Sequence, residues 1–210
     1  MDALPRRFYD RNAVLVAPAL LGCLLVRRDR GALLVARIVE TEAYVGDHDL
    51  ACHARVGKTP RTEVMYGEPG RAYVYLIYGI HQMLNCVCGP GGAPNAVLLR
   101  AAEQAPGSAP WLHRSATGPG NLCKALGVER RHNRGDLCDA GGELFIAPRP
   151  PGAVRPRVLR GPRVGVGYAG VWAGEPLRFC DGDSLAVSKP APAEAPVAPR
   201  QPGRRARPKE

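Results

Sequence analysis

The chain has 210 residues, 45% of them hydrophobic and 23% charged, a composition typical of one folded domain and not of a disordered or fibrous protein. The formal charge of +10 at pH 7 favours nucleic acid or another polyanion as a partner. No apolar run approaches the roughly 18–20 residues that span a bilayer, and no signal peptide is recognisable, so we expect no membrane association.

In the N-terminal part, residues 11–21 are expected to form a helix that Pro18 bends or shifts. Two strands follow, residues 23–26 and 33–44, around a turn at residues 29–31. Strand alternation places four side chains of the second strand on one face: Ile38, Glu40, Glu42 and Tyr44.

The middle of the chain begins with a long polar connection, residues 46–70, of a kind that is usually functional or disordered in a compact domain. After it, the pattern predicts three strands, at residues 72–78, 83–88 and 96–101. A glycine-rich turn then opens a helix over residues 121–126, which Gly127 ends. Later strands are expected at residues 143–147, 163–168 and 177–179.

Many short strands with few helices predict an α+β fold. We expect the folded domain to cover residues 1–188. Residues 189–210 are rich in Pro, Ala and Arg and carry six basic against two acidic side chains, a net +4 of the total +10. Such a tail is expected to be disordered, and it either adds attraction to polyanions or is inert.

Seven cysteines are scattered along the chain, an odd number without a C-x-x-C pair. This pattern argues against a disulfide framework and against a zinc ribbon, and it favours a reducing compartment. His48, Cys52 and His53 have a spacing that matches no common zinc pattern, and the signature of the zinc base deaminases is absent. We therefore expect neither a metal site nor another cofactor.

Charged and aromatic side chains interrupt segments that otherwise resemble buried strands. Glu42 either acts as a general base in a cleft or faces solvent on a half-exposed strand. Tyr73 and Tyr75 share a strand face and Tyr78 lies on the other, so these tyrosines either stack on bases or simply pack.

Two polar residues lie in apolar strands, where each must find a partner. Asn85 and Arg100 could both be structural, with Arg100 pairing with Glu40 or Glu42. The glycine turn at Gly118 and Gly120 could present amide N–H groups to a phosphate, a weak signal by itself. No Walker motif, dinucleotide fingerprint or G-x-S-x-G elbow is present.

Taken together, several ordered segments resemble the alkyladenine (3-methyladenine) DNA glycosylase family, the single-domain type of mammals and many bacteria. The resemblance covers roughly residues 8–188 and is carried by residues 37–44, 59–61, 73–79, Asn85, 98–101, 122–126, 163–169 and 176–179. It implies one compact mixed domain around a largely antiparallel curved sheet with a protruding hairpin. It also implies a cytoplasmic, nucleoid-associated bacterial enzyme, a monomer on damaged double-stranded DNA.

The resemblance further implies a role for each site residue. Glu42 looks like the general base that activates water, and Arg100 helps to orient that water. Tyr78 looks like the wedge that fills the space left by a flipped base. Tyr44, His53 and Tyr75 look like the walls around that base, and Asn85 like a selectivity element that excludes guanine. Contacts with the DNA backbone are expected from Arg61, Gly118, Gly120 and Lys124.

These residue types fit monofunctional hydrolysis of the N-glycosidic bond of alkylated or deaminated purines, because no lysine matches a catalytic motif for Schiff-base chemistry. The sequence does not rank 3-methyladenine, 7-methylguanine, hypoxanthine and ethenoadenine. It departs from the family pattern in a short segment at residues 105–117, at Asn121 and at Val171. Two alternatives stay open: a non-catalytic basic DNA-binding module, and a hydrolase acting on RNA or nucleotides.

Overall fold

The computed structural model describes residues 1–192, which form a single mixed α+β domain. Its three α-helices are α1 (Arg6–Tyr9), α2 (Ala13–Ala19) and α3 (Pro119–Leu126). The eight strands are β1 (Leu24–Asp29), β2 (Ala32–Val45), β3 (Ala72–Ile77), β4 (His81–Cys88), β5 (Asn95–Gln104), β6 (Leu144–Ala147), β7 (Val158–Gly161) and β8 (Arg178–Asp181). Short 3₁₀ segments lie at His53–Val56, Glu63–Tyr66, Pro90–Gly92, Arg130–His132 and Gly167–Ala173.

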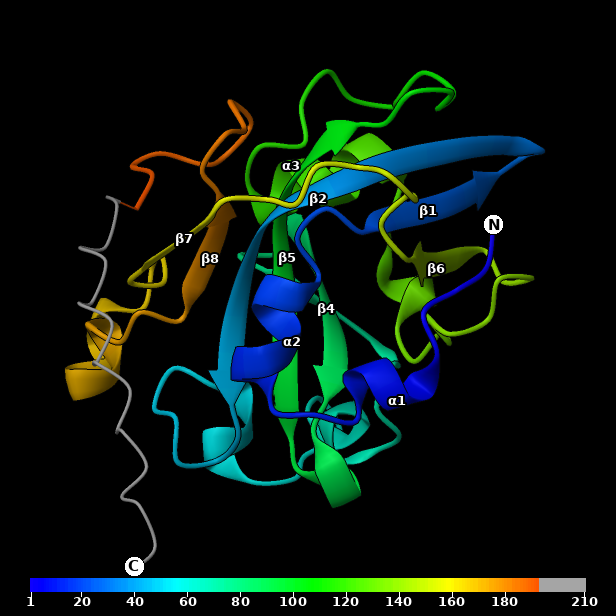
Figure 1. Ribbon diagram of the computed structural model, residues 1–210. Helices are drawn as coiled ribbons and strands as arrows, with labels where there is room; N and C mark the ends of the chain where they lie inside the picture. Colours follow the sequence, from blue (N-terminus) through cyan, green and yellow to red (C-terminus); the bar gives the residue numbers. More distant parts are fainter. Residues whose placement is uncertain (193–210) are drawn as a thin grey trace, which may run out of the picture.

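The strands form one curled sheet in which every pairing is antiparallel (Figure 1). Its order is β3-β4-β5-β2-β1-β6, and β8 pairs with both β2 and β7. The long strand β2 changes neighbour along one edge, from β1 over its first half to β8 at Glu40, Thr41 and Glu42. This change of partner brings the C-terminal strands next to the middle of β2.

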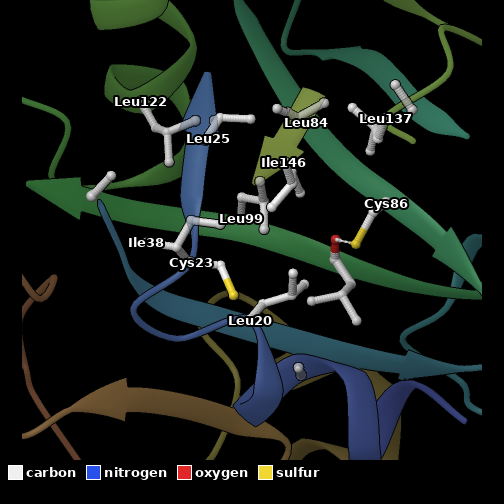
Figure 2. Packing of buried hydrophobic residues seen from close by; sticks show 14 of the residues in the cluster. Leu20, Cys23, Leu25, Ile38, Leu84, Cys86, Leu99, Leu122, Leu137 and Ile146 are labelled. Atoms are coloured by element: carbon white, nitrogen blue, oxygen red, sulfur yellow. Dashed lines mark hydrogen bonds between the residues drawn. The ribbon is translucent and has the colours of Figure 1, made fainter. Parts of the chain in front are cut away.

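The main hydrophobic core lies on one face of the sheet, between the strands and α2 and α3 (Figure 2). Alternate residues of the central strands supply it, among them Leu84, Cys86 and Leu99, and Leu122 of α3 packs against them. The helix α2 begins at Asn12, whose side chain accepts a hydrogen bond from the Val14 N–H as an N-cap. The opposite face of the same strands is left for the other alternating set of side chains.

A pair of bulges interrupts the pairing of β2 with β5. Val39 and Arg100 each lack a partner in an otherwise continuous register. As a result, Ile38 lies in the main core, whereas Glu40 and Glu42 lie on the opposite face. The prediction that Ile38 shares a face with Glu40 was therefore wrong, because one extra residue reverses the alternation.

Most strands expected from the sequence are confirmed to within three residues at each end, including the hairpin of β3 and β4. The predicted strand at residues 163–168 is wrong. Gly165 has a φ of +76°, which interrupts an extended strand, and a 3₁₀ segment forms over Gly167–Ala173. Two short elements, α1 and β7, were not predicted, and β7 is mostly exposed and lacks an alternating apolar pattern.

The predicted tail falls mostly outside the described residues, since only 189–192 of it are described. Within residues 1–192, no helix has the length and hydrophobicity that a membrane crossing requires.

Candidate active site

A cavity of about 210 Å³ opens on the face of the sheet opposite the core. This volume is below the roughly 300–1,000 Å³ of pockets for drug-sized ligands, and it suits a single flat ring system. The strands β2 to β5 form its floor, and the connection at residues 46–70 and the segment 164–168 form its sides. Its lining includes Tyr44, Cys52, His53, Tyr73, Tyr75, Tyr78, Asn85, Leu98, Arg100, Pro119, Val164 and Tyr168.

One wall of the cavity is aromatic. The ring centroids of His53 and Tyr75 lie 4.6 Å apart, and those of Tyr73 and Tyr75 lie 5.2 Å apart. The Nδ1 of His53 is 2.9 Å from the Tyr73 hydroxyl. Burial, helped by the positive charges of Arg61 and Arg55, lowers the pKa of His53 to about 4, so its ring is neutral near pH 7.

Tyr44 also lines the cavity, and two contacts hold its side chain. Its hydroxyl donates a 2.9 Å hydrogen bond to Oε2 of Glu42. The guanidinium carbon of Arg163 lies 4.7 Å from the centre of its ring. Arg163 is itself fixed by a fully buried, two-pronged ion pair with Asp49 and by a hydrogen bond to the Ala43 carbonyl.

Glu42 is fully buried next to this cavity. Its Oε1 accepts a 2.7 Å hydrogen bond from the Val164 N–H and lies 3.3 Å from Nη1 of Arg100. Burial raises the pKa of Glu42, and Arg100, the Val164 N–H and the Tyr44 hydroxyl oppose that rise. Within residues 1–192, Oε2 accepts one hydrogen bond, from Tyr44, so it keeps an unused lone pair, although Glu42 itself is not among the residues that line the cavity.

Arg100 joins Glu42 to a second buried carboxylate. Its Nε donates a 2.9 Å hydrogen bond to Oε1 of Glu40, while its Nη1 faces Glu42. Both alternatives for its pairing are thus realised. Because Arg100 is also part of the cavity lining, its guanidinium connects the cavity with the buried charges behind it.

Asn85 lies buried in the floor of the cavity, and its Nδ2 donates a 3.1 Å hydrogen bond to the Tyr73 carbonyl. Tyr78 stands at the tip of the β3–β4 hairpin and is 85% exposed, with a φ of +53°. The neighbouring Ile80 is exposed as well. The hairpin therefore presents two large apolar side chains to solvent at the mouth of the cavity.

The residues expected to contact the DNA backbone lie in two parts of the chain. The guanidinium of Arg61 is 5.1 Å from the ring centre of Tyr75, so it stands beside the aromatic wall. Gly118 and Gly120 belong to the start of α3, where Pro119 lines the cavity. Lys124 is exposed further along the same helix.

Four residues that hold the site in place were not predicted from the sequence. They are Asp49, Arg163 and Val164, described above, and Arg178, whose Nε donates a 2.7 Å hydrogen bond to Oε1 of Glu40. A signal existed for Arg163, an arginine in the apolar run that was taken for a strand. His48 is exposed and packs against Trp172, apart from Cys52. Within residues 1–192, no group of three or more His, Cys, Asp or Glu side chains could hold a metal ion.

Comparison with known proteins gives one consistent result. The family model for methylpurine-DNA glycosylase (MPG) matches residues 7–184. A protein of Myxococcus xanthus is 54% identical over 192 residues, 91% of this chain and 96% of the relative. One of Anaeromyxobacter dehalogenans is 56% identical over 90% and 88% of the two chains, and one of Methanocella arvoryzae is 47% identical over 92% and 100%. All three carry the name "Putative 3-methyladenine DNA glycosylase".

Proposed function

Because this chain belongs to the methylpurine-DNA glycosylase family, whose members are hydrolases of N-glycosyl bonds in DNA, we propose that it excises 3-methyladenine and related alkylated or deaminated purines from duplex DNA. Glu42 activates the water that replaces the base. The observation that carries the proposal is the position of Glu42. This buried carboxylate accepts a hydrogen bond from Tyr44 and forms an ion pair with Arg100, and both partners line a base-sized aromatic cavity.

The substrate base must leave the duplex, because its glycosidic bond cannot be reached within the stack. The exposed Tyr78 at the hairpin tip has the size and position for a wedge that fills the vacated space. Arg61, which lies beside Tyr75, and the amides at Gly118 and Gly120, next to the cavity-lining Pro119, contact the phosphates, together with the exposed Lys124 of the same helix. The formal charge of +10 attracts the duplex before these contacts form.

Inside the cavity, the flipped base stacks between Tyr44 on one side and His53 with Tyr75 on the other. Alkylated purines that carry positive charge gain from the electron-rich rings and from a His53 that stays neutral near pH 7. Asn85 on the floor takes up the space that the exocyclic amino group of guanine would need, so normal guanine is rejected.

Cleavage builds positive charge on the deoxyribose. The carboxylate of Glu42 stabilises that charge and takes a proton from a water held at its open lone pair. Arg100 keeps Glu42 ionised and orients the same water. The lysines of the described part, Lys58, Lys124 and Lys189, are exposed and line no part of the cavity, which supports hydrolysis without a Schiff base.

A panel of lesions tests this proposal. Duplexes carrying 7-methylguanine, hypoxanthine or ethenoadenine, and alkylated DNA containing 3-methyladenine, are incubated with the protein, and released bases are separated by chromatography. We expect release from at least one alkylated purine and none from matched undamaged duplex. Binding without release from any lesion supports the non-catalytic module instead. Release from RNA or free nucleosides at the same rate points to a nucleotide hydrolase.

A further inference from the structure

The buried charged residues Glu40, Glu42 and Arg100 lie between the cavity and the C-terminal part of the described chain. Residues 186–190, here called the strap, run over Glu40. The Thr117 hydroxyl donates a hydrogen bond to the Ala186 carbonyl, and Val187 is buried with Val39, Ala101 and Cys180. The strap is thus attached to the domain before it reaches Glu40.

Ser188 is the point at which the strap meets the buried charges. Its hydroxyl donates a 2.7 Å hydrogen bond to Oε1 of Glu40, and its N–H donates one of 2.7 Å to Oε2. The Nη2 atoms of Arg100 and Arg178 each lie 3.4 Å from the same hydroxyl oxygen. Arg178 also donates to the carbonyls of Ser188 and Pro190, at 2.5 and 2.8 Å.

Glu40 accepts four hydrogen bonds through these contacts. Nε of Arg100, Nε of Arg178 and the Ser188 hydroxyl all donate to Oε1, and the Ser188 N–H donates to Oε2. The negative charge of Glu40 is therefore balanced by these donors together, and Nη1 of Arg100 can stay next to Glu42. Without the Ser188 hydroxyl, Glu40 has one donor fewer and attracts Arg100 more strongly.

We propose that Ser188 is a positioning residue for the reaction: it satisfies Glu40 and so leaves one edge of the Arg100 guanidinium facing Glu42. This inference rests on the proposed function of Glu42. Ser188 touches neither the cavity nor the substrate base, and it acts through Glu40 and Arg100.

The consequence is a change in the ionisation of Glu42. The charged and titratable groups around Glu42 come from several elements, namely Arg100 of β5, Glu40 and Tyr44 of β2, Tyr75 of β3 and Arg163. Of these, Arg100 contributes the largest favourable effect on the carboxylate. When Arg100 moves towards Glu40, the pKa of Glu42 rises and the acid limb of the rate profile moves to higher pH.

The experiment compares Ser188→Ala with Ser184→Ala. Ser184 lies just before the strap. Its hydroxyl donates a hydrogen bond to the carboxylate of Glu103 and accepts one of 3.1 Å from the Ala186 N–H, so Ser184→Ala weakens the attachment of the strap without removing a donor from Glu40. We expect Ser188→Ala to lower the single-turnover rate of base release at neutral pH roughly 3- to 10-fold, the effect of one net hydrogen bond, with duplex binding unchanged. Ser188→Thr restores the rate, and Ser184→Ala leaves it unchanged even where thermal stability falls.

A second measurement does not need activity. The ionisation of Glu42 is followed by NMR of protein with labelled glutamate, using Glu42→Gln to assign the signal. We expect a higher Glu42 pKa in Ser188→Ala and an unchanged one in Ser184→Ala. An unchanged Glu42 pKa in Ser188→Ala, or equal slowing by both serine variants, overturns the inference. Wild-type protein that releases no base overturns the proposed function alone, because the NMR result still decides whether Ser188 positions Arg100.

Discussion

Two carboxylates on β2, Glu40 and Glu42, are both fully buried and both contact Arg100, yet their surroundings differ. Glu40 lies under the strap and accepts four hydrogen bonds from arginine and serine donors, three of them on Oε1. Glu42 lies beside the cavity and accepts two, from the Val164 N–H and the Tyr44 hydroxyl. Burial alone therefore does not distinguish the two carboxylates, whereas the number of donors and the position beside the cavity do, and both favour Glu42 as the proposed base.

The largest effect is expected when Glu42, the carboxylate beside the cavity, loses its charge. Glu42→Gln keeps the shape of the side chain and removes the base, so base release should fall by about 10²–10⁴-fold, the range of a lost general base. Binding to a lesion-containing duplex should persist. Single-turnover kinetics measure base release, a gel-shift titration measures duplex binding, and a thermal melt confirms that the variant is folded. Release that survives in Glu42→Gln contradicts the assignment.

Removing the charge of Glu40, the carboxylate under the strap, should lower the stability of the fold. Glu40→Gln leaves Arg100 and Arg178 with less negative charge in a dry environment, so the free energy of unfolding should fall by about 3–5 kcal/mol. Urea denaturation measures it. The control is Glu103→Gln, which breaks a half-exposed pair with Arg37 and should cost less. If Glu40→Gln is as stable as the wild type and simply inactive, the two carboxylates do not have separate roles.

The different surroundings of Glu40 and Glu42 were only partly predictable from the sequence. Strand alternation placed Glu40, Glu42 and Tyr44 on one face, and the need of a buried arginine for a partner placed Arg100 beside them. The bulges at Val39 and Arg100 were not visible, because no residue type marks them and they depend on how β2 changes partner from β1 to β8.

The contacts that finish the site come from distant parts of the chain. The Val164 N–H reaches Glu42 across 122 residues, and Ser188 reaches Glu40 across 148. A backbone N–H carries no sequence signal, and a single serine before a proline-rich tail resembles the start of a linker. Local patterns thus predicted most strands and the grouping of Glu40, Glu42, Tyr44 and Arg100, but not the segments that close around them.

A third substitution tests whether the aromatic wall serves to bind the base and not simply to pack the protein. Tyr75→Ala removes a ring from the cavity and should weaken binding of a lesion duplex by about 1–3 kcal/mol, the range of one lost stacking contact. Tyr66→Ala is the matched control, because Tyr66 packs on the same small cluster but is not part of the cavity lining. Fluorescence anisotropy measures both. Equal losses in the two variants would assign the aromatic wall to packing.

The smallest expected effect concerns the pH dependence of base release. Burial raises the pKa of Glu42 above its ordinary 4.5, and the Tyr44 hydroxyl is one of the groups that oppose the rise. The general base must be ionised, so the rate should fall as pH drops through this raised pKa. Tyr44→Phe keeps the ring and removes the hydroxyl, so the acid limb should move to higher pH while the plateau rate changes little.

The hydroxyl of Tyr73 supplies the control for that shift. Tyr73→Phe removes a hydrogen bond to His53 and leaves Glu42 without any change in its donors. Its acid limb should stay where the wild type has it, although base binding can weaken. Rate profiles recorded under single turnover from below the raised pKa to neutral pH distinguish the two tyrosines. A limb that moves equally in both variants, or to lower pH in Tyr44→Phe, means that the ionisation of Glu42 does not limit the reaction.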